Sequence, residues 1–246
     1  MTDSSRGQPF LTAEWCDLVM LNYPIERELL EPLAPAGTMV DTYRGVAYVS
    51  LVGFLFQRTK VLGIPVLFHQ SFEEVNLRFY VRRFAGDEWR RGVVFIKEIV
   101  PAFLVSNTAR FFYNENYITC AMRHRTENQG ETRMLEYTWE YGGEWHRMSA
   151  QAATPAKPAL AGSLEEFISD HQWGYTRQRD GSTLEYEVVH PKWDVVQAQS
   201  PQLKCDIVGL YGSRFSPALL GQPSSAFVIP GSAVSVYRGN VVAPAG

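Results

Sequence analysis

The sequence has few cysteines, little net charge and no long apolar run. Its three cysteines, Cys16, Cys120 and Cys205, lie far apart and show no CxxC spacing. An odd number of distant thiols argues against a disulfide framework and against a zinc site. The net charge of −3, with no basic stripe, argues against a nucleic-acid partner. Because no apolar stretch approaches the ~20 residues that a helix needs to cross a bilayer, we also expect no membrane partner.

Signatures of cofactors and of secretion are absent as well. The five histidines are scattered, and neither GxGxxG nor GK[ST] occurs, so we predict no metal and no cofactor. Residues 1–9 are polar and lack the apolar core of a signal peptide. We therefore interpret residues 1–9 as a loose leader, residues 10–246 as a single domain, and the protein as cytoplasmic.

The remaining pattern is mainly that of β-strands. With 46% hydrophobic and 20% charged residues, the composition is that of an ordinary globular protein. Many short apolar or alternating segments, separated by turn residues, favour a barrel or a sandwich. We expect a few short helices, at Ala13–Leu21 after a Thr12 N-cap, at Glu26–Leu33, within Ala102–Phe112 and after the capping box that Ser163 begins. The expected strands cover residues 46–56, 72–83, 92–100, 117–124, 131–141, 144–150, 173–178, 184–190, 193–203 and 226–237.

The strand expected at residues 72–83 alternates between apolar and polar side chains. Its polar members are Glu74, Asn76, Arg78 and Tyr80, which must share one face because alternate side chains of a strand leave on opposite sides. A polar face turned to solvent is ordinary in antiparallel sheets. We favour a face that lines an enclosed, small polar cavity, because polar residues inside a barrel usually line a ligand site.

Within such a cavity these side chains would have distinct roles. Arg78 would pair with a ligand carboxylate, with Asn76 and Tyr80 as further ligand-binding groups. Glu74 is the candidate acid–base group, since a desolvated carboxyl group has a raised pKa. Glu74 and Arg78 lie ~13 Å apart along a strand, so they could hold opposite ends of a small ligand.

Lys97 and His190 are weaker candidates. Lys97 and Glu98 are neighbours in an apolar strand and must face opposite sides, so one of them faces the interior. We favour a charge at the strand end over a catalytic lysine, because lysines are seldom buried. A lone histidine is more often a hydrogen-bonded structural residue, but His190 also stands as a candidate ligand-binding group.

Several motifs in the same order resemble a known family. Residues 72–81 (FEEVNLRFYV), 92–95 (GVVF), 109–110 (AR), 113–117 (YNENY) and 190–193 (HPKW) resemble the YqjF-like family of uncharacterised proteins. That family is similar to the acetoacetate decarboxylase superfamily. The resemblance implies a mainly β (α+β) fold, a closed, antiparallel, cone-shaped barrel with a few short flanking helices. It also implies a cavity for a small carboxylate- or carbonyl-bearing molecule.

The decarboxylase chemistry of that superfamily does not carry over. Schiff-base decarboxylation needs a lysine with a lowered pKa, and the resemblance places Tyr117 (or, one residue along, Asn116) at the lysine's position. Glu74 matches a glutamate that the superfamily places beside its reactive centre. Arg110, Glu115 and Tyr117 correspond to the turn that completes the superfamily's site, although a structural salt bridge and a core tyrosine explain these residues equally well.

Two functions from different classes stay open at this point. The first is a barrel that binds a small organic acid or carbonyl compound and catalyses lysine-independent acid–base chemistry on it, such as enolisation or hydration. The second is a non-catalytic ligand-binding or sensor module that uses the same cavity. A barrel filled by its own side chains is a third interpretation. The expected partner is a small molecule, and the sequence is compatible with a homo-oligomer.

Overall fold

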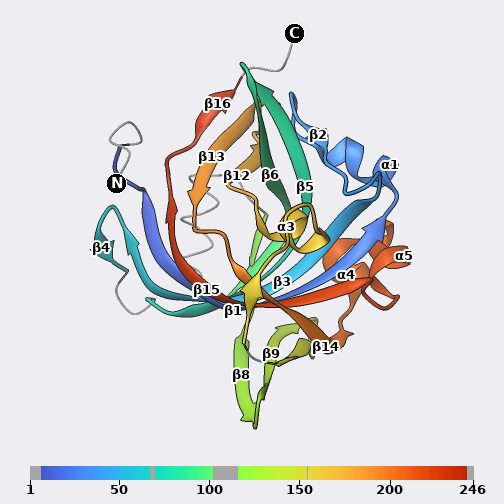
Figure 1. The fold of residues 1–246 in the computed structure, drawn as a ribbon. Coiled ribbons are helices and arrows are strands. Elements are labelled where there is room, and N and C mark those ends of the chain that lie inside the picture. Colours follow the sequence, from blue (N-terminus) through green and yellow to red (C-terminus); the bar gives the residue numbers. More distant parts are fainter. Residues whose placement is uncertain (1–6, 67–69, 102–115, 154, 243–246) are drawn as a thin grey trace.

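The fold is mostly β, as predicted. A computed structural model describes residues 7–66, 70–101, 116–153 and 155–242. The strands form one 16-stranded sheet, with a few short helices around it (Figure 1). Most neighbouring strands are antiparallel, whereas β6 pairs in parallel with β7 and with β12.

The elements follow one another along the chain with short connections. The strands are β1 (Leu11–Ile25), β2 (Met39–Val40), β3 (Ala47–Val61), β4 (Ile64–Pro65), β5 (Phe72–Ala85), β6 (Glu88–Val100), β7 (Tyr117–Thr119), β8 (Met122–Gln129), β9 (Thr132–Tyr141), β10 (Glu144–Ala153), β11 (Lys157–Pro158), β12 (Trp173–Arg177), β13 (Thr183–Val189), β14 (Asp194–Lys204), β15 (Ser225–Val236) and β16 (Asn240–Val242). The helices are α1 (Arg27–Leu30), η1 (Glu31–Leu33), α3 (Leu164–Ser169), α4 (Ile207–Tyr211), η2 (Ser213–Phe215) and α5 (Ser216–Leu219).

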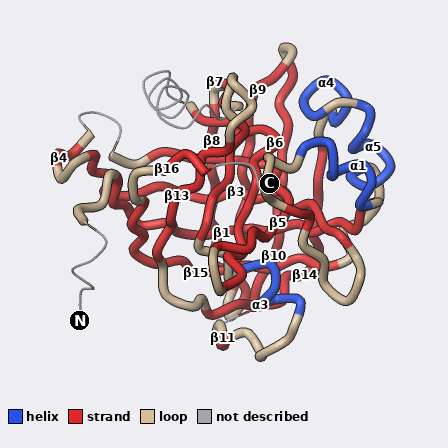
Figure 2. The backbone as a smooth tube through the Cα atoms, turned by 90° about the horizontal axis from the view of Figure 1, so that it is seen from above, coloured by secondary structure: helices blue, strands red, loops and turns tan. Residues whose placement is uncertain are grey.

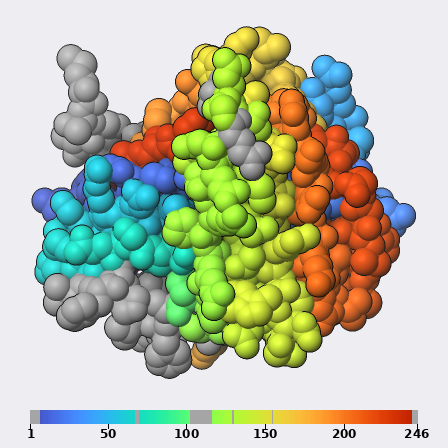
Figure 3. All heavy atoms as spheres, turned by 90° about the horizontal axis from the view of Figure 1, so that it is seen from below, coloured from blue at the N-terminus to red at the C-terminus, as the bar shows by residue number. Residues whose placement is uncertain are grey.

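The strand pairings divide the sheet into two parts. From β13 the pairings run through β12, β6, β5, β3 and β1 to β15, and β13 also pairs with β15. From β15 the sheet continues into β14, β10, β9 and β8. Seen from below, β8, β9 and β10 (yellow-green) cross the face of the molecule between the cyan and the orange segments (Figure 3). Helices α1, α4 and α5 gather on one side, and α3 lies apart from them (Figure 2).

Strand β5 separates two hydrophobic cores. Its side chains Val75, Leu77 and Phe79 belong to one cluster, which also contains Tyr137 and Trp139 of β9. The alternate residues Phe72 and Tyr80 belong to a second cluster, which also contains Val52 and Phe54 of β3. Both faces of β5 are therefore buried, and its even-numbered residues face the second cluster.

One local prediction was wrong. The helix expected at Ala13–Leu21 is part of β1, which pairs with β3 on one edge and with β15 on the other. An apolar run buried on both faces resembles a buried helix in sequence, and these pairings override helix propensity. The segment 212–225, between α4 and β15, contains η2 and α5. The helix expected within Ala102–Phe112 lies outside the described residues, whereas the one at Glu26–Leu33 is confirmed as α1 and η1.

Candidate functional site

A cavity of about 180 Å³ lies against the inner faces of β1, β3, β5 and β6. Glu74, Asn76 and Arg78 of β5 line it, and all three are buried. Tyr80, the fourth polar residue on this face, is fully buried beside the cavity, and its hydroxyl lies 2.6 Å from that of Ser50. The alternation in β5 thus brings three of the four predicted side chains to one cavity.

Four residues on four neighbouring strands are paired one after the other, and all of them line the cavity. Val52 of β3 lies opposite Asn76 of β5, Asn76 lies opposite Glu98 of β6, and Glu98 lies beside Tyr117 of β7. All four line the cavity, and Glu98 is 1% exposed. The predicted residue Tyr117 therefore lines the cavity, and so does Glu98, which the sequence did not predict as a site residue. The adjacent charges Lys97-Glu98 in an apolar strand were the signal that could have identified it.

A β-bulge in β6 decides which of these two charges faces the cavity. Lys97 pairs with Leu77 and Phe95 pairs with Arg78, which leaves Ile96 as the extra residue. The simple alternation assumed for Val93–Ile99 therefore fails at Ile96. Phe95 and Glu98 both line the cavity, although one is odd-numbered and the other even-numbered.

No lysine lines this cavity. The five lysines of the chain all lie in the described residues, and none of them is among the cavity-lining side chains. Lys97 instead lines a second, more open hollow of about 770 Å³, together with Arg177 and Arg214. Arg177 donates hydrogen bonds to the carbonyl oxygens of Pro32 and Ala34, at the end of η1.

Several polar atoms in the cavity lining lack a hydrogen-bond partner within the described residues, and two of them belong to neighbouring side chains on one face of β5. The Nδ2 atom of Asn76 donates to Oε1 of Glu74 at 2.9 Å, which fixes the orientation of the amide. Oδ1 of Asn76 therefore remains as an acceptor, and it has no partner. The Nε atom of Arg78 is a donor without a partner, and the Arg78 side chain is 7% exposed.

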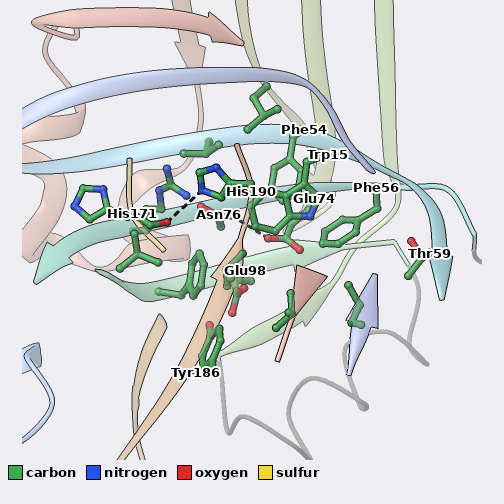
Figure 4. Close-up of a pocket in the computed structure, with 18 of the residues that line it drawn as sticks. Trp15, Phe54, Phe56, Thr59, Glu74, Asn76, Glu98, His171, Tyr186 and His190 are labelled. Carbon is green, nitrogen blue, oxygen red and sulfur yellow. Dashed lines mark hydrogen bonds between the residues drawn. The ribbon is translucent and has the colours of Figure 1, made fainter. Parts of the chain in front are cut away.

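Two buried histidines lie at the same end of the cavity (Figure 4). The ring of His190 stacks on Trp193 at 3.9 Å, with Nδ1 2.8 Å from the carbonyl oxygen of Pro191. The ring of His171 lies 4.7 Å from Tyr80 and 5.7 Å from Phe167, measured between ring centroids. Burial lowers the pKa of both imidazoles, and the neighbouring Arg91 and Arg78 lower that of His171 further. Both rings are therefore neutral near pH 7.

The opposite end of the cavity is aromatic. Trp15, Phe54, Phe56 and Phe72 line it, and the rings of Phe56 and Phe72 stack at 4.6 Å. Figure 4 shows Phe56 and Thr59 at the end away from His171. The expectation of a polar cavity was therefore wrong for most of the lining. The reason is that β3 and β1, the next two strands of the sheet after β5, contribute apolar residues to the same cavity.

Helix α3 lies at the histidine end of the cavity and leads into His171. Oγ of Ser163 accepts a hydrogen bond from the backbone N–H of Glu166 at 3.2 Å, as the predicted capping box requires. Lys192, in the segment before β14, forms an ion pair with Glu166, in which Nζ of Lys192 lies 2.9 Å from Oε1 of Glu166. Ser169, the last residue of α3, lines the cavity. The candidates Arg110 and Glu115 lie outside the described residues.

A family model covers most of this chain. The DUF2071 model, described as an uncharacterized conserved protein (COG2071), matches residues 12–233. The chain belongs to the DUF2071 family. A curated relative, the uncharacterized protein YqjF of Bacillus subtilis (strain 168), is 25% identical over 180 residues, which are 72% of this chain and 70% of the relative. The predicted resemblance to YqjF-like proteins is thereby confirmed.

Solved structures with the same fold are acetoacetate decarboxylase-like. Acetoacetate decarboxylase of Legionella pneumophila is 13% identical, with a TM-score of 0.63 over 96% of this DUF2071 chain and 88% of that one. An acetoacetate decarboxylase-like enzyme of Sphingomonas wittichii RW1 is 11% identical, with a TM-score of 0.65 over 97% and 95%. The enduracididine biosynthesis enzyme MppR, complexed with the condensation product of pyruvate and imidazole 4-carboxaldehyde, is 11% identical, with a TM-score of 0.64 over 99% and 94%. At these identities the likeness shows the fold alone.

In the described part of the DUF2071 chain, no helix combines the length and the apolar character needed to cross a membrane.

Proposed function

We propose that this DUF2071 chain binds a small organic acid or carbonyl compound in the cavity of a closed, cone-shaped barrel formed by a single domain, residues 10–246, of a cytoplasmic protein. The observation that carries the proposal is the buried Arg78, whose Nε–H faces no acceptor within the described residues. A buried guanidinium N–H without an acceptor is costly, and a carboxylate or carbonyl oxygen is the natural partner for it. The mixed lining, mostly apolar with a few convergent polar groups, is typical of small-molecule sites.

The proposed chemistry is proton transfer without a lysine. Glu74 is 3% exposed and lies between the Arg78 end of β5 and its aromatic end, opposite Phe54. A carboxyl group in such surroundings can remove and return a proton beside a carbonyl group that Arg78 orients. Glu98 lies beside this position with Tyr117, the residue that the resemblance aligns with the superfamily's lysine. Enolisation is the reaction that these groups support best.

The binding step can be tested by calorimetry with 4-methylpentanoate, an acid with a short apolar chain. We expect binding that the uncharged analogue 4-methylpentan-1-ol does not share. Arg78→Met should weaken acid binding by about tenfold or more, because a charge-assisted hydrogen bond is lost. Arg82→Met, on the same strand but with its guanidinium packed over Trp89, is the matched control and should bind normally. Equal affinity for the acid and the alcohol would contradict the proposal.

The catalytic step can be tested without knowing the full reaction. In D₂O, 4-methyl-2-oxopentanoate exchanges the protons next to its carbonyl group through the enol, and NMR follows this exchange. We expect the protein to accelerate it and Glu74→Gln to reduce the acceleration about 100-fold while binding is retained. Binding without accelerated exchange would instead support the ligand-binding or sensor module.

A further inference from the structure

Two neighbouring polar atoms on β5, which have no hydrogen-bond partner within the described residues, specify the head of the ligand. Arg78 offers a donor at Nε, and Asn76 offers an acceptor at Oδ1 whose orientation is fixed by the bond to Glu74. The two residues are neighbours on one face of β5, ~7 Å apart along the strand. A ligand that satisfies both must therefore present an acceptor and a donor side by side. A simple carboxylate offers acceptors alone and leaves Oδ1 of Asn76 without a partner.

The charges around Asn76 indicate which donor fits. Glu98 lies directly opposite Asn76 across β5 and β6, and Glu74 bonds to its amide. Both carboxyl groups are buried, so their effect on a bound group is less screened than it would be at the surface. A positively charged ammonium group is stabilised at this point more than a hydroxyl group.

The aromatic end of the cavity sets the size and polarity of the ligand's tail. Proceeding along β5 from Arg78, the lining changes from Asn76 and Glu74 to Phe72, with Phe54 and Phe56 beside it on β3. The volume of about 180 Å³ compares with ~150 Å³ for an apolar cavity that holds benzene. An apolar group about as large as the side chain of leucine fits this space.

We infer that the cavity binds an α-amino acid with a branched aliphatic side chain, such as leucine. Its carboxylate accepts from Nε of Arg78, and its ammonium group donates to Oδ1 of Asn76 beside Glu74 and Glu98. Its side chain packs against Phe54 and Phe56. This inference rests on the proposed function, because it specifies the class of organic acid that the same cavity takes.

A series of ligands with one carbon skeleton tests the inference by calorimetry. Leucine, 2-hydroxy-4-methylpentanoate and 4-methylpentanoate differ at one position, which carries an ammonium group, a hydroxyl group or hydrogen. We expect leucine to bind about tenfold more tightly than the hydroxy acid, and the hydroxy acid to bind at least as tightly as the unsubstituted acid. Glycine, which lacks the tail, and 3-methylbutylamine, which lacks the carboxylate, should each bind about tenfold more weakly than leucine.

The outcomes separate this inference from the proposed function. If 4-methylpentanoate binds as tightly as leucine, the inference is overturned while the proposed function stands. If no member of the series binds, both fail. If 3-methylbutylamine equals leucine, the carboxylate contact with Arg78 is contradicted and with it both claims.

Two variants locate the contacts. Asn76→Leu should reduce the preference for leucine over 4-methylpentanoate to about twofold or less, since the acceptor is lost. Phe56→Ala enlarges the aromatic end and should shift the preference from leucine toward phenylalanine. Because either substitution could destabilise the core, a normal circular dichroism spectrum and thermal transition are required for each. A well-folded Asn76→Leu variant that keeps the full preference overturns the inference.

Discussion

Asn76 and Glu98 lie directly opposite each other on β5 and β6, and both line the cavity. They meet because Ile96 is an extra residue in β6, which reverses the alternation of side chains beyond it. In a regular strand that begins with Val93 toward the cavity, Lys97 would face inward and Glu98 outward. One bulge therefore gives the cavity a carboxyl group in place of an amine. The same bulge removes the nearest substitute for a Schiff-base lysine.

This arrangement predicts opposite results for two adjacent substitutions. Glu98→Gln should weaken leucine binding about fivefold to tenfold, because it removes one of the charges that stabilise the ammonium group. Lys97→Met should leave the affinity unchanged within about twofold, because Lys97 lines the second hollow behind the strand. Calorimetry of both variants checks this pair. Weaker binding by Lys97→Met alone would show that the assigned faces of β6 are reversed.

The absence of a lysine from the cavity lining predicts that no Schiff base forms. Incubation with acetoacetate and borohydride should add no mass to the protein, because a neutral amine next to the carbonyl group is required for the adduct. Intact-mass spectrometry measures this directly, with a known lysine-dependent decarboxylase as the positive control. An adduct that peptide mapping assigns to Lys97 would contradict the predicted chemistry.

The sequence predicted β5 well because one strand carries the whole pattern. Its alternation is regular over Glu74, Asn76 and Arg78, and no bulge interrupts the strand itself. The prediction failed for β1, where Leu18, Val19, Met20 and Leu21 are buried on both faces and leave no period of two to detect. Pairing of β1 with distant strands decides its structure, and no local signal reports such pairing.

The composition of the cavity wall was harder to predict than its polar face. Phe54, Phe56 and Trp15 come from strands that have no alternating pattern. Their place in the cavity wall follows from strand pairing, which sets Phe54 and Phe56 beside β5 and Trp15 beside Phe56. The orientation of Glu98 toward the cavity depends on the bulge at Ile96. A bulge has no strong sequence signature when the extra residue is apolar. The polar half of the site could therefore be read from sequence, whereas the aromatic half required the pairing of β1, β3 and β5.

A close backbone approach at Gly231 predicts a large loss of stability. Gly231 has φ of 101°, and a Cβ atom there would lie 1.8 Å from the carbonyl oxygen of Trp15 on the paired strand β1. Gly231→Ala should lower the free energy of unfolding by about 3 kcal/mol or more, since both strain and overlap oppose it. Gly221→Ala, where the nearest atom would lie at 3.6 Å, should change it by less than about 1 kcal/mol. Urea denaturation of both variants measures these changes. Equal free energies of unfolding for the two variants would contradict the close approach at Gly231.

The buried imidazole of His171 predicts that the protein loses stability in mild acid. Burial lowers the pKa of His171 well below its ordinary value, and the positive charges of Arg91 and Arg78 act in the same direction. Below pH ~6.5 the unfolded chain binds a proton at this position that the folded chain does not bind. The free energy of unfolding is therefore fully retained above that pH and falls below it, by at most about 1.4 kcal/mol per pH unit for one group.

His171→Phe isolates this contribution to the pH dependence. The phenyl ring can keep the contacts with Tyr80 and Phe167 but cannot bind a proton. His190, whose pKa burial also lowers, remains in the variant, so a reduced slope should persist. From pH 7.5 to 5.5 the wild-type protein should lose about 1 kcal/mol more than the variant, as measured by urea denaturation at each pH. If the free energy of unfolding falls equally with pH in both proteins, His171 has the same affinity for protons in the folded and unfolded chains, and the prediction is wrong.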